Sequence, residues 1–74
     1  MNNENLVRMA NQIGNFFEAM PDRQQALEDI VQHVRKFWEP RMRRQILEHL
    51  DQQEGEGLSD ILLAALARHR QLLE

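Results

Sequence analysis

Three histidines, His33, His49 and His69, are the side chains of this sequence best suited to acid–base or metal chemistry. They lie too far apart along the chain for any two to share a turn of helix, and no His-Glu-x-x-His pattern is present. The only serine, Ser59, is placed to cap a helix, and Cys, Thr and Tyr are absent. Only tertiary folding could bring the histidines together. We therefore expect no catalytic residue, no metal site and no cofactor site in this chain.

A basic and aromatic segment, RKFWEPRMRR at residues 35–44, is the most unusual feature of the sequence. It holds five of the nine Lys and Arg residues but only one acid, in a chain whose net charge is −3. Arginine and aromatic residues are enriched at the energetic centres of protein–protein interfaces. We therefore predict a partner-binding site here, with Trp38 as its anchor. Its predicted residues are Arg35, Phe37, Trp38, Pro40, Arg41, Met42 and Arg43.

The two aromatic residues of this segment are consecutive, so one helix cannot direct both toward the same core. One of Phe37 and Trp38 should lie at the surface. A second interpretation needs no partner: Trp38 fills the junction of two helices, and the arginines are solvated with their stems over it.

The elements that must position this segment are helices, because good helix formers dominate and no β-like alternation occurs. Apolar spacing predicts helices over about 3–20, 22–38, 40–53 and 60–73. Asp22 and Gln25 resemble a capping box, Pro40 suits a first helical position, and Gly14 predicts a close helix crossing. The fold class is all-α, a small antiparallel bundle of three to four amphipathic helices.

The glycine-rich stretch EGEG at 54–57 is the clearest break in the pattern. We expect one domain overall, with a three-helix core at 1–53, a flexible linker at 54–57 and a C-terminal amphipathic helix at 58–74. With 74 residues and no disulfide, such a domain favours self-association or docking on a larger protein. The longest apolar run, 61–67, is too short to span a membrane, and no signal peptide is visible. These features indicate a soluble, cytoplasmic protein.

The sequence resembles the delta subunit of cytoplasmic, NAD-dependent, molybdenum-containing formate dehydrogenases. The resemblance rests on LVRMANQI at 6–13, the Phe16–Phe17 pair and HVRKFWEPRMR at 33–43. It covers about 5–50 well and 57–66 more loosely, while 51–56 and the C-terminal tail match little. Glu39 stands where Asp is expected, which bears only on helix capping.

The resemblance implies a non-catalytic accessory subunit that docks on the large (alpha) subunit and supports assembly, cofactor insertion or stability. In that family the partner subunits carry the molybdopterin, iron–sulfur clusters and flavin, and this chain carries none. Two alternatives come from the residues alone. Helices meeting at Glu39–Pro40 could imitate a DNA-binding helix-turn-helix, although the acidic remainder argues against nucleic acid. The leucines at 62, 66, 72 and 73 could instead form a homodimer through a tethered last helix.

Overall fold

The computed structural model describes residues 2–74 and contains four α-helices followed by a short 3₁₀ turn. The helices are α1 (Asn3–Phe17), α2 (Arg23–Phe37), α3 (Pro40–Gln53) and α4 (Asp60–His69), and the 3₁₀ turn is η1 (Arg70–Leu72). No strand occurs within residues 2–74. The all-α prediction is therefore confirmed.

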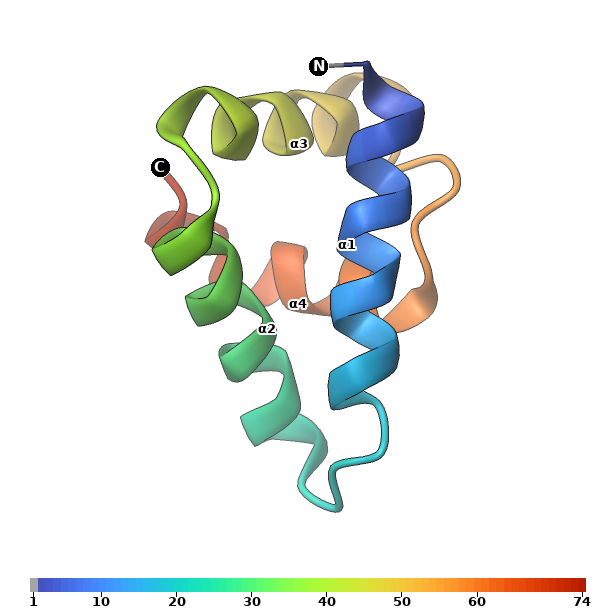
Figure 1. The fold of residues 1–74 in the computed structure, drawn as a ribbon, viewed down its shortest axis with the longest axis vertical. Helices are drawn as coiled ribbons and strands as arrows, with labels where there is room; N and C mark the ends of the chain where they lie inside the picture. The colour runs from blue at the N-terminus through green and yellow to red at the C-terminus, as the bar shows by residue number, and fades with distance from the viewer. Residues whose placement is uncertain (1) are drawn as a thin grey trace.

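The helices cross one another rather than forming one parallel stack. Figure 1 shows α1 and α2 running antiparallel, joined by the turn at 18–22, with α3 across their upper ends and α4 behind them. The most extensive helix–helix contact is between α2 and α4, and α1 contacts each of the other three helices. As a result α4 lies behind the gap between the first two helices and closes the core.

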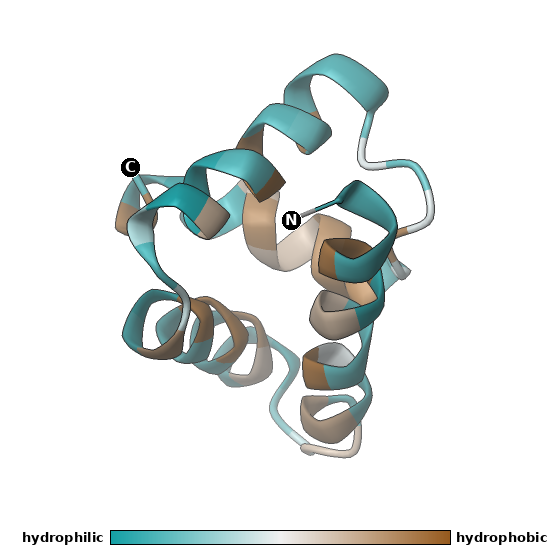
Figure 2. Cartoon of the chain, turned by 45° about the horizontal axis from the view of Figure 1, so that its top comes forward, coloured by the Kyte–Doolittle hydropathy of each residue, from teal (hydrophilic) through white to brown (hydrophobic). Residues whose placement is uncertain are grey.

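The core takes fully buried residues from every helix. The side chains with at most 2% exposure include Leu6, Ala10, Ala26, Ile30, Val31, Val34, Ile46, Ile61, Leu62, Ala65 and Leu66. Figure 2 shows the hydrophobic bands of α1, α2 and α4 turned toward the interior, while α3 is hydrophilic on its outer side. One hydrophobic core therefore serves the whole chain.

The close crossing predicted at Gly14 is confirmed. A Cβ atom at Gly14 would lie 2.3 Å from Cδ2 of Leu62 and 3.0 Å from Cγ2 of Ile61. Only a residue without a side chain lets α1 approach α4 this closely. The mid-helix glycine is thus a packing feature that admits α4 to the core.

The last helix, which the sequence predicted to be separate from the other three, is part of the same core. The α4 residues Ile61, Leu62 and Leu66 are at most 2% exposed, so this helix belongs to the core. The leucines at 62, 66 and 73 that were expected to mediate self-association are buried within this chain, and Leu72 is half-buried.

The linker at 54–57 is a pinned turn. Gly55 is buried, and the left-handed backbone at Glu54, Gly55 and Gly57 reverses the chain over a short distance. Asn11 fixes the end of the turn: its Nδ2 donates to the carbonyl of Gly57 at 3.0 Å, and its Oδ1 accepts from the N–H of Ser59 at 2.9 Å. Sequence composition correctly predicted a break between helices at 54–57. It did not predict that a side chain of α1 fixes this turn.

The helix ends differ from expectation only locally. The first helix ends at Phe17 rather than near Met20, and the last becomes a 3₁₀ turn after His69. Asp22 caps α2 by accepting from the N–H of Gln25 at 3.2 Å. The capping box is incomplete, because the Gln25 side chain donates to Asp29 instead. Ser59 occupies the N-cap position of α4, but its side chain makes no capping bond.

Candidate protein-binding site

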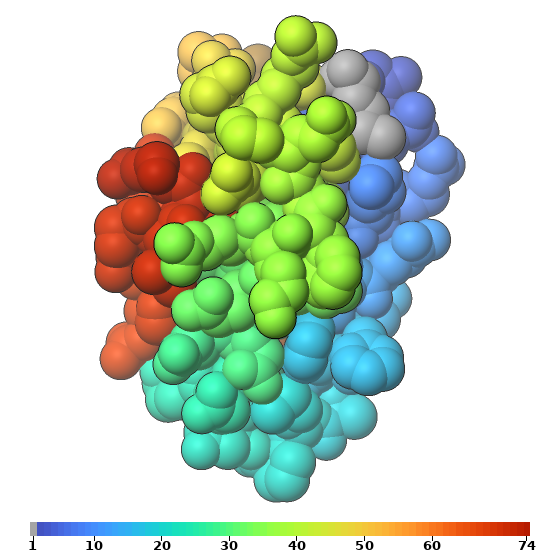
Figure 3. All heavy atoms as spheres, turned by 60° about the vertical axis from the view of Figure 1, so that its left-hand side comes forward, coloured from blue at the N-terminus to red at the C-terminus, as the bar shows by residue number. Residues whose placement is uncertain are grey.

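The predicted binding segment forms the joint between α2 and α3. The N–H of Trp38 still bonds to the carbonyl of Val34 at 2.9 Å, but Trp38 and Glu39 have extended backbone, so α2 stops there. Pro40 then opens α3, where its missing N–H costs no helical hydrogen bond. The chain therefore turns sharply between two rigid helices. Figure 3 shows this turn, in yellow-green, between α1 and the C-terminal residues.

The structure separates the two aromatic residues of the joint. Phe37 is 67% exposed, whereas Trp38 is 7% exposed and belongs to the core. The expectation that one of the pair would lie at the surface is confirmed. The role of anchor given to Trp38 needs correction, because its ring is already buried by this chain at the meeting of α2 and α3. Phe37 is the aromatic side chain that remains free for a partner.

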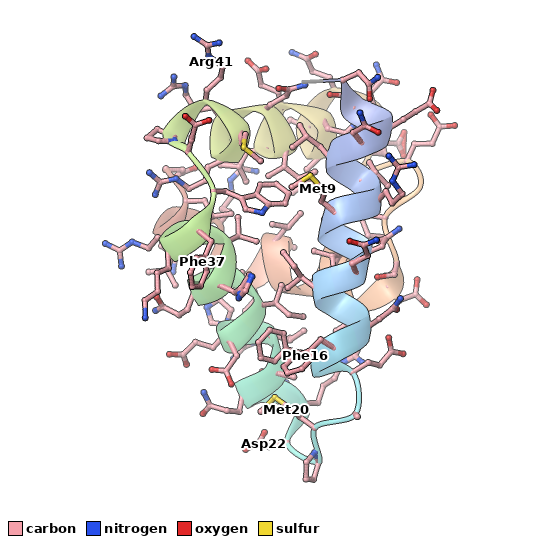
Figure 4. All side chains as sticks on the ribbon, in the orientation of Figure 1. Met9, Phe16, Met20, Asp22, Phe37 and Arg41 are labelled. Carbon is pink, nitrogen blue, oxygen red and sulfur yellow. The ribbon has the colours of Figure 1, made fainter. Side chains whose placement is uncertain are left out.

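The other predicted residues divide between exposed and half-buried positions. Arg35, Pro40 and Arg41 are exposed, while Met42 and Arg43 are partly buried. Part of the Arg43 side chain therefore faces the protein: its Nε atom is shielded from solvent and has no hydrogen-bond partner. Figure 4 shows Arg41 pointing outward from the start of α3. The joint thus presents Arg35 and Arg41 outward more freely than Arg43.

The cations of the joint have no ion-pair partner in the part of the chain that the structure describes. Among residues 2–74 the ion pairs join Arg70 to Asp51 at 2.8 Å and to Glu74 at 3.1 Å, and none involves residues 35–44. Arg41 and Arg43 lie in the first turn of α3, where the helix dipole disfavours positive charge and no acid is present. Local structure therefore gives no reason for these arginines.

A row of aromatic rings runs across the outer face of α1 and α2. The Phe16 and Phe17 centroids are 5.0 Å apart in an edge-to-face arrangement, and Phe17 is 6.3 Å from the His33 ring. His33 in turn lies 4.7 Å from Phe37. Phe16 is 77% exposed, so both ends of the row are open to solvent. This aromatic row therefore connects the predicted joint to the first helix.

A groove lies beside the aromatic row, between α1 and α2, with a volume of about 410 Å³. Its lining consists of Met9, Gln12, Ile13, Phe16, Phe17, His33 and Trp38. Figure 4 shows Met9 and Phe16 on α1 and Phe37 on α2, all on the front face. Trp38 thus contributes an edge to the groove although most of its surface is buried.

Sequence reasoning missed this face because Phe16 and Phe17 both continue the apolar spacing of the first helix, which by itself predicts burial for both. Their apolar type fits that prediction, but consecutive residues on a helix point about 100° apart. The signal that could have found the face is the same one noted for Phe37 and Trp38. The chain has two pairs of consecutive aromatic residues, and each pair leaves one ring exposed.

The three histidines do not converge on a common site. His49 is 7% exposed; its Nε2–H donates to the carbonyl of Glu56 at 2.8 Å, and its Nδ1 accepts from Nδ2 of Asn3 at 3.4 Å. His33 packs within the aromatic row, tilted against Phe37, and Nε2 of His69 is buried without a hydrogen-bond partner. Within residues 2–74 no three His, Asp or Glu side chains are placed to hold a metal.

The two residues whose pKa values are clearly shifted, Asp51 and Arg70, do not line the groove. A hydrogen bond from Arg70 is the main cause that lowers the pKa of Asp51, and the hydrogen bonds to Asp51 and Glu74 raise the pKa of Arg70. This exposed cluster ties the C-terminal turn to α3. None of the helices described in residues 2–74 has the length and apolar character needed to cross a membrane.

Comparison with known protein families places most of the chain in a described family. Residues 5–66 match the family described as NADH-dependent formate dehydrogenase delta subunit FdsD. This range includes the joint, the aromatic row and the groove. No curated protein and no solved structure matches the chain.

Proposed function

The chain belongs to the FdsD family of NADH-dependent formate dehydrogenase delta subunits, and from this membership we propose a non-catalytic role in that complex. The chain docks on the large molybdenum-containing subunit and supports assembly, cofactor insertion or stability. The family match over 5–66 carries the proposal, since it covers nearly the whole chain. It also supports placing the chain in the cytoplasm with its complex.

The formate chemistry belongs, in this proposal, to the other subunits. Both ring nitrogens of His49 have partners within the chain, and His33 is packed between aromatic rings. These contacts give the two histidines structural roles. They support assigning the molybdopterin centre, the iron–sulfur clusters and the flavin to the partner subunits.

The joint between α2 and α3 supplies the charged part of the proposed docking surface. Its exposed arginines have no ion pair among residues 2–74, and at Arg41, in the first turn of α3, the helix dipole is unfavourable to a cation. Carboxylates on the large subunit would pair with these arginines and would offset the unfavourable helix dipole. Arginine binds carboxylates in a bidentate fashion, which also fixes the orientation of the docked chain.

The test is co-purification of the complex from cells that express all subunits, with this chain wild-type, absent or altered. Arg41→Glu with Arg44→Glu is the variant pair of choice, because both positions are exposed and the fold should persist. Arg68→Glu, exposed near the end of α4, is the matched charge control. We expect loss of the chain from the complex in the pair and retention in the control.

Molybdenum content and formate-dependent NADH production should fall when the chain is absent. Full molybdenum loading and full activity without the chain would contradict the supporting role. Failure of the wild-type chain to co-purify with the large subunit would contradict docking itself. Binding of the isolated chain to DNA, with a steep salt dependence, would support the nucleic-acid alternative instead.

A further inference from the structure

We infer that the groove between α1 and α2 receives an apolar side chain of the large subunit that is flanked by carboxylates. This inference rests on the proposed function and deepens it, because it names the surface and the chemistry of the segment that binds there. The groove would form the apolar centre of the interface, and the cations at its edge would form the charged rim.

The first supporting observation is the exposure of Phe16 and Phe37. These are the large hydrophobic residues left exposed among residues 2–74, at 77% and 67%, and they terminate the same aromatic row. Phenylalanine is among the residues most often buried in a folded protein. A contiguous exposed aromatic surface on so small a domain marks an interaction site. Phe17 and His33 join the two rings into one surface.

The second observation is the shape and lining of the groove. Met9 and Ile13 supply aliphatic surface, and the edge of Trp38 contributes to the wall. Methionine is unbranched and adapts to the shape of an incoming side chain. Interface residues that contribute most to affinity are those that fill such pockets. The groove is therefore suited to one bulky apolar side chain.

The third observation is the charge at the edge of the groove. A second hollow, lined by Phe17, Asp29, Gln32, His33, Lys36 and Phe37, adjoins it through the shared Phe17 and His33. Asp29 there accepts a hydrogen bond from Gln25 at 2.9 Å, whereas Lys36 and the neighbouring Arg35 form no ion pair with any residue described at 2–74. A partner with carboxylates beside its apolar side chain complements this rim.

The same charges argue against a second copy of this chain as the occupant. In a two-fold dimer the same patch meets itself. The cations at 35, 36, 41 and 44 would then be brought toward their counterparts. A partner with acidic residues is therefore favoured over self-association through this face.

The binding test uses the purified chain and a formate dehydrogenase complex prepared without it. Phe16→Ala and Phe37→Ala should each weaken binding at least about tenfold, the scale of a residue central to an interface. Phe37→Leu should recover part of the affinity, because it restores apolar volume. Lys36→Glu should also weaken binding, whereas the exposed control positions in Gln24→Ala and Arg68→Glu should not. Circular dichroism and thermal unfolding should be unchanged in all these variants.

The location of the contact is tested by a photo-crosslinking amino acid in place of Phe16, within the assembled complex. We expect a crosslink to a segment of the large subunit that contains both apolar and acidic residues. Wild-type affinity in Phe16→Ala and Phe37→Ala would overturn the inference and leave the proposed function standing. A crosslink to another subunit, or to a second copy of this chain, would also overturn it. No binding of the wild-type chain to the complex would instead count against the proposed function.

Discussion

Two positions on α1, only two residues apart in sequence, differ sharply in how their surface is used. At Gly14 the helix gives up its side chain so that Leu62 of α4 can approach, and the contact is sealed from solvent. At Phe16 the same helix presents a large ring that is 77% exposed. The crossing of α1 and α4 has no space for a methyl group at Gly14, while the outer face carries aromatic surface that residues 2–74 leave exposed.

The contrast between Gly14 and Phe16 shows that the aromatic row is not exposed because the fold is loosely packed. A 74-residue domain has little apolar surface to spare. The fold nevertheless buries small and aliphatic residues at its centre and leaves two of its three phenylalanines outside. This is the pattern expected of a subunit whose remaining apolar surface belongs to an interface.

The largest expected effect separates the neighbours Trp38 and Phe37. Trp38→Ala should lower the free energy of unfolding by about 3–5 kcal/mol, because it empties a buried site. That is much of the roughly 4–11 kcal/mol available to a domain of this size. Phe37→Ala should change it by less than about 0.5 kcal/mol, as expected of an exposed substitution. Urea unfolding of both variants measures the contrast.

Equal destabilisation by the two substitutions would contradict the assignment of Trp38 to the core and of Phe37 to the outer face. The expected contrast also governs how binding experiments are read. Loss of binding in Trp38→Ala would reflect loss of the fold, so Phe37 is the informative position at the joint.

A smaller effect is expected where the pinned turn joins the core. His49→Ala should lower the free energy of unfolding by about 1–3 kcal/mol, since it removes a buried side chain and leaves the Glu56 carbonyl without its donor. Asn3→Ala should cost less, because its hydrogen bond to His49 is long at 3.4 Å and Asn3 is exposed. Amide hydrogen exchange at 54–58 reports the turn directly. Unchanged exchange in His49→Ala would mean that the glycine-rich backbone holds its conformation without the histidine.

The sequence predicted local structure better than it predicted surfaces. Helical spacing located every helix, and Pro40 and Asp22 fixed two starts correctly, because caps and proline geometry depend on neighbouring residues. The role of α4 was misjudged because the composition of EGEG indicates flexibility, whereas Asn11, far away in sequence, and His49, on the preceding helix, hold that turn. The aromatic row was missed for a related reason. Whether Phe16 or Phe17 is covered depends on how α2 packs, which the residue types do not encode.

The smallest expected effect distinguishes two kinds of surface arginine. Arg70 is paired with Asp51, whose pKa is lowered chiefly by their hydrogen bond, whereas Arg41 forms no ion pair among the residues that the structure describes. A lowered pKa in the folded state means that the pair stabilises the fold above the usual aspartate pKa, and that this contribution disappears as the pH falls through the folded value. Asp51→Asn should therefore lower the thermal unfolding midpoint slightly at pH 7 and should not lower it at strongly acidic pH. Because the pair is exposed, 1 M salt should also reduce the difference.

Arg41→Ala should not lower the midpoint under any of these conditions, since its carboxylate partner is proposed to lie on another subunit. At low salt it should raise the midpoint slightly, because it removes a cation from the first turn of α3. A lowering by Arg41→Ala as large as that by Asp51→Asn would show that Arg41 already has a stabilising partner in this chain, and the case for an external one at that position would be lost.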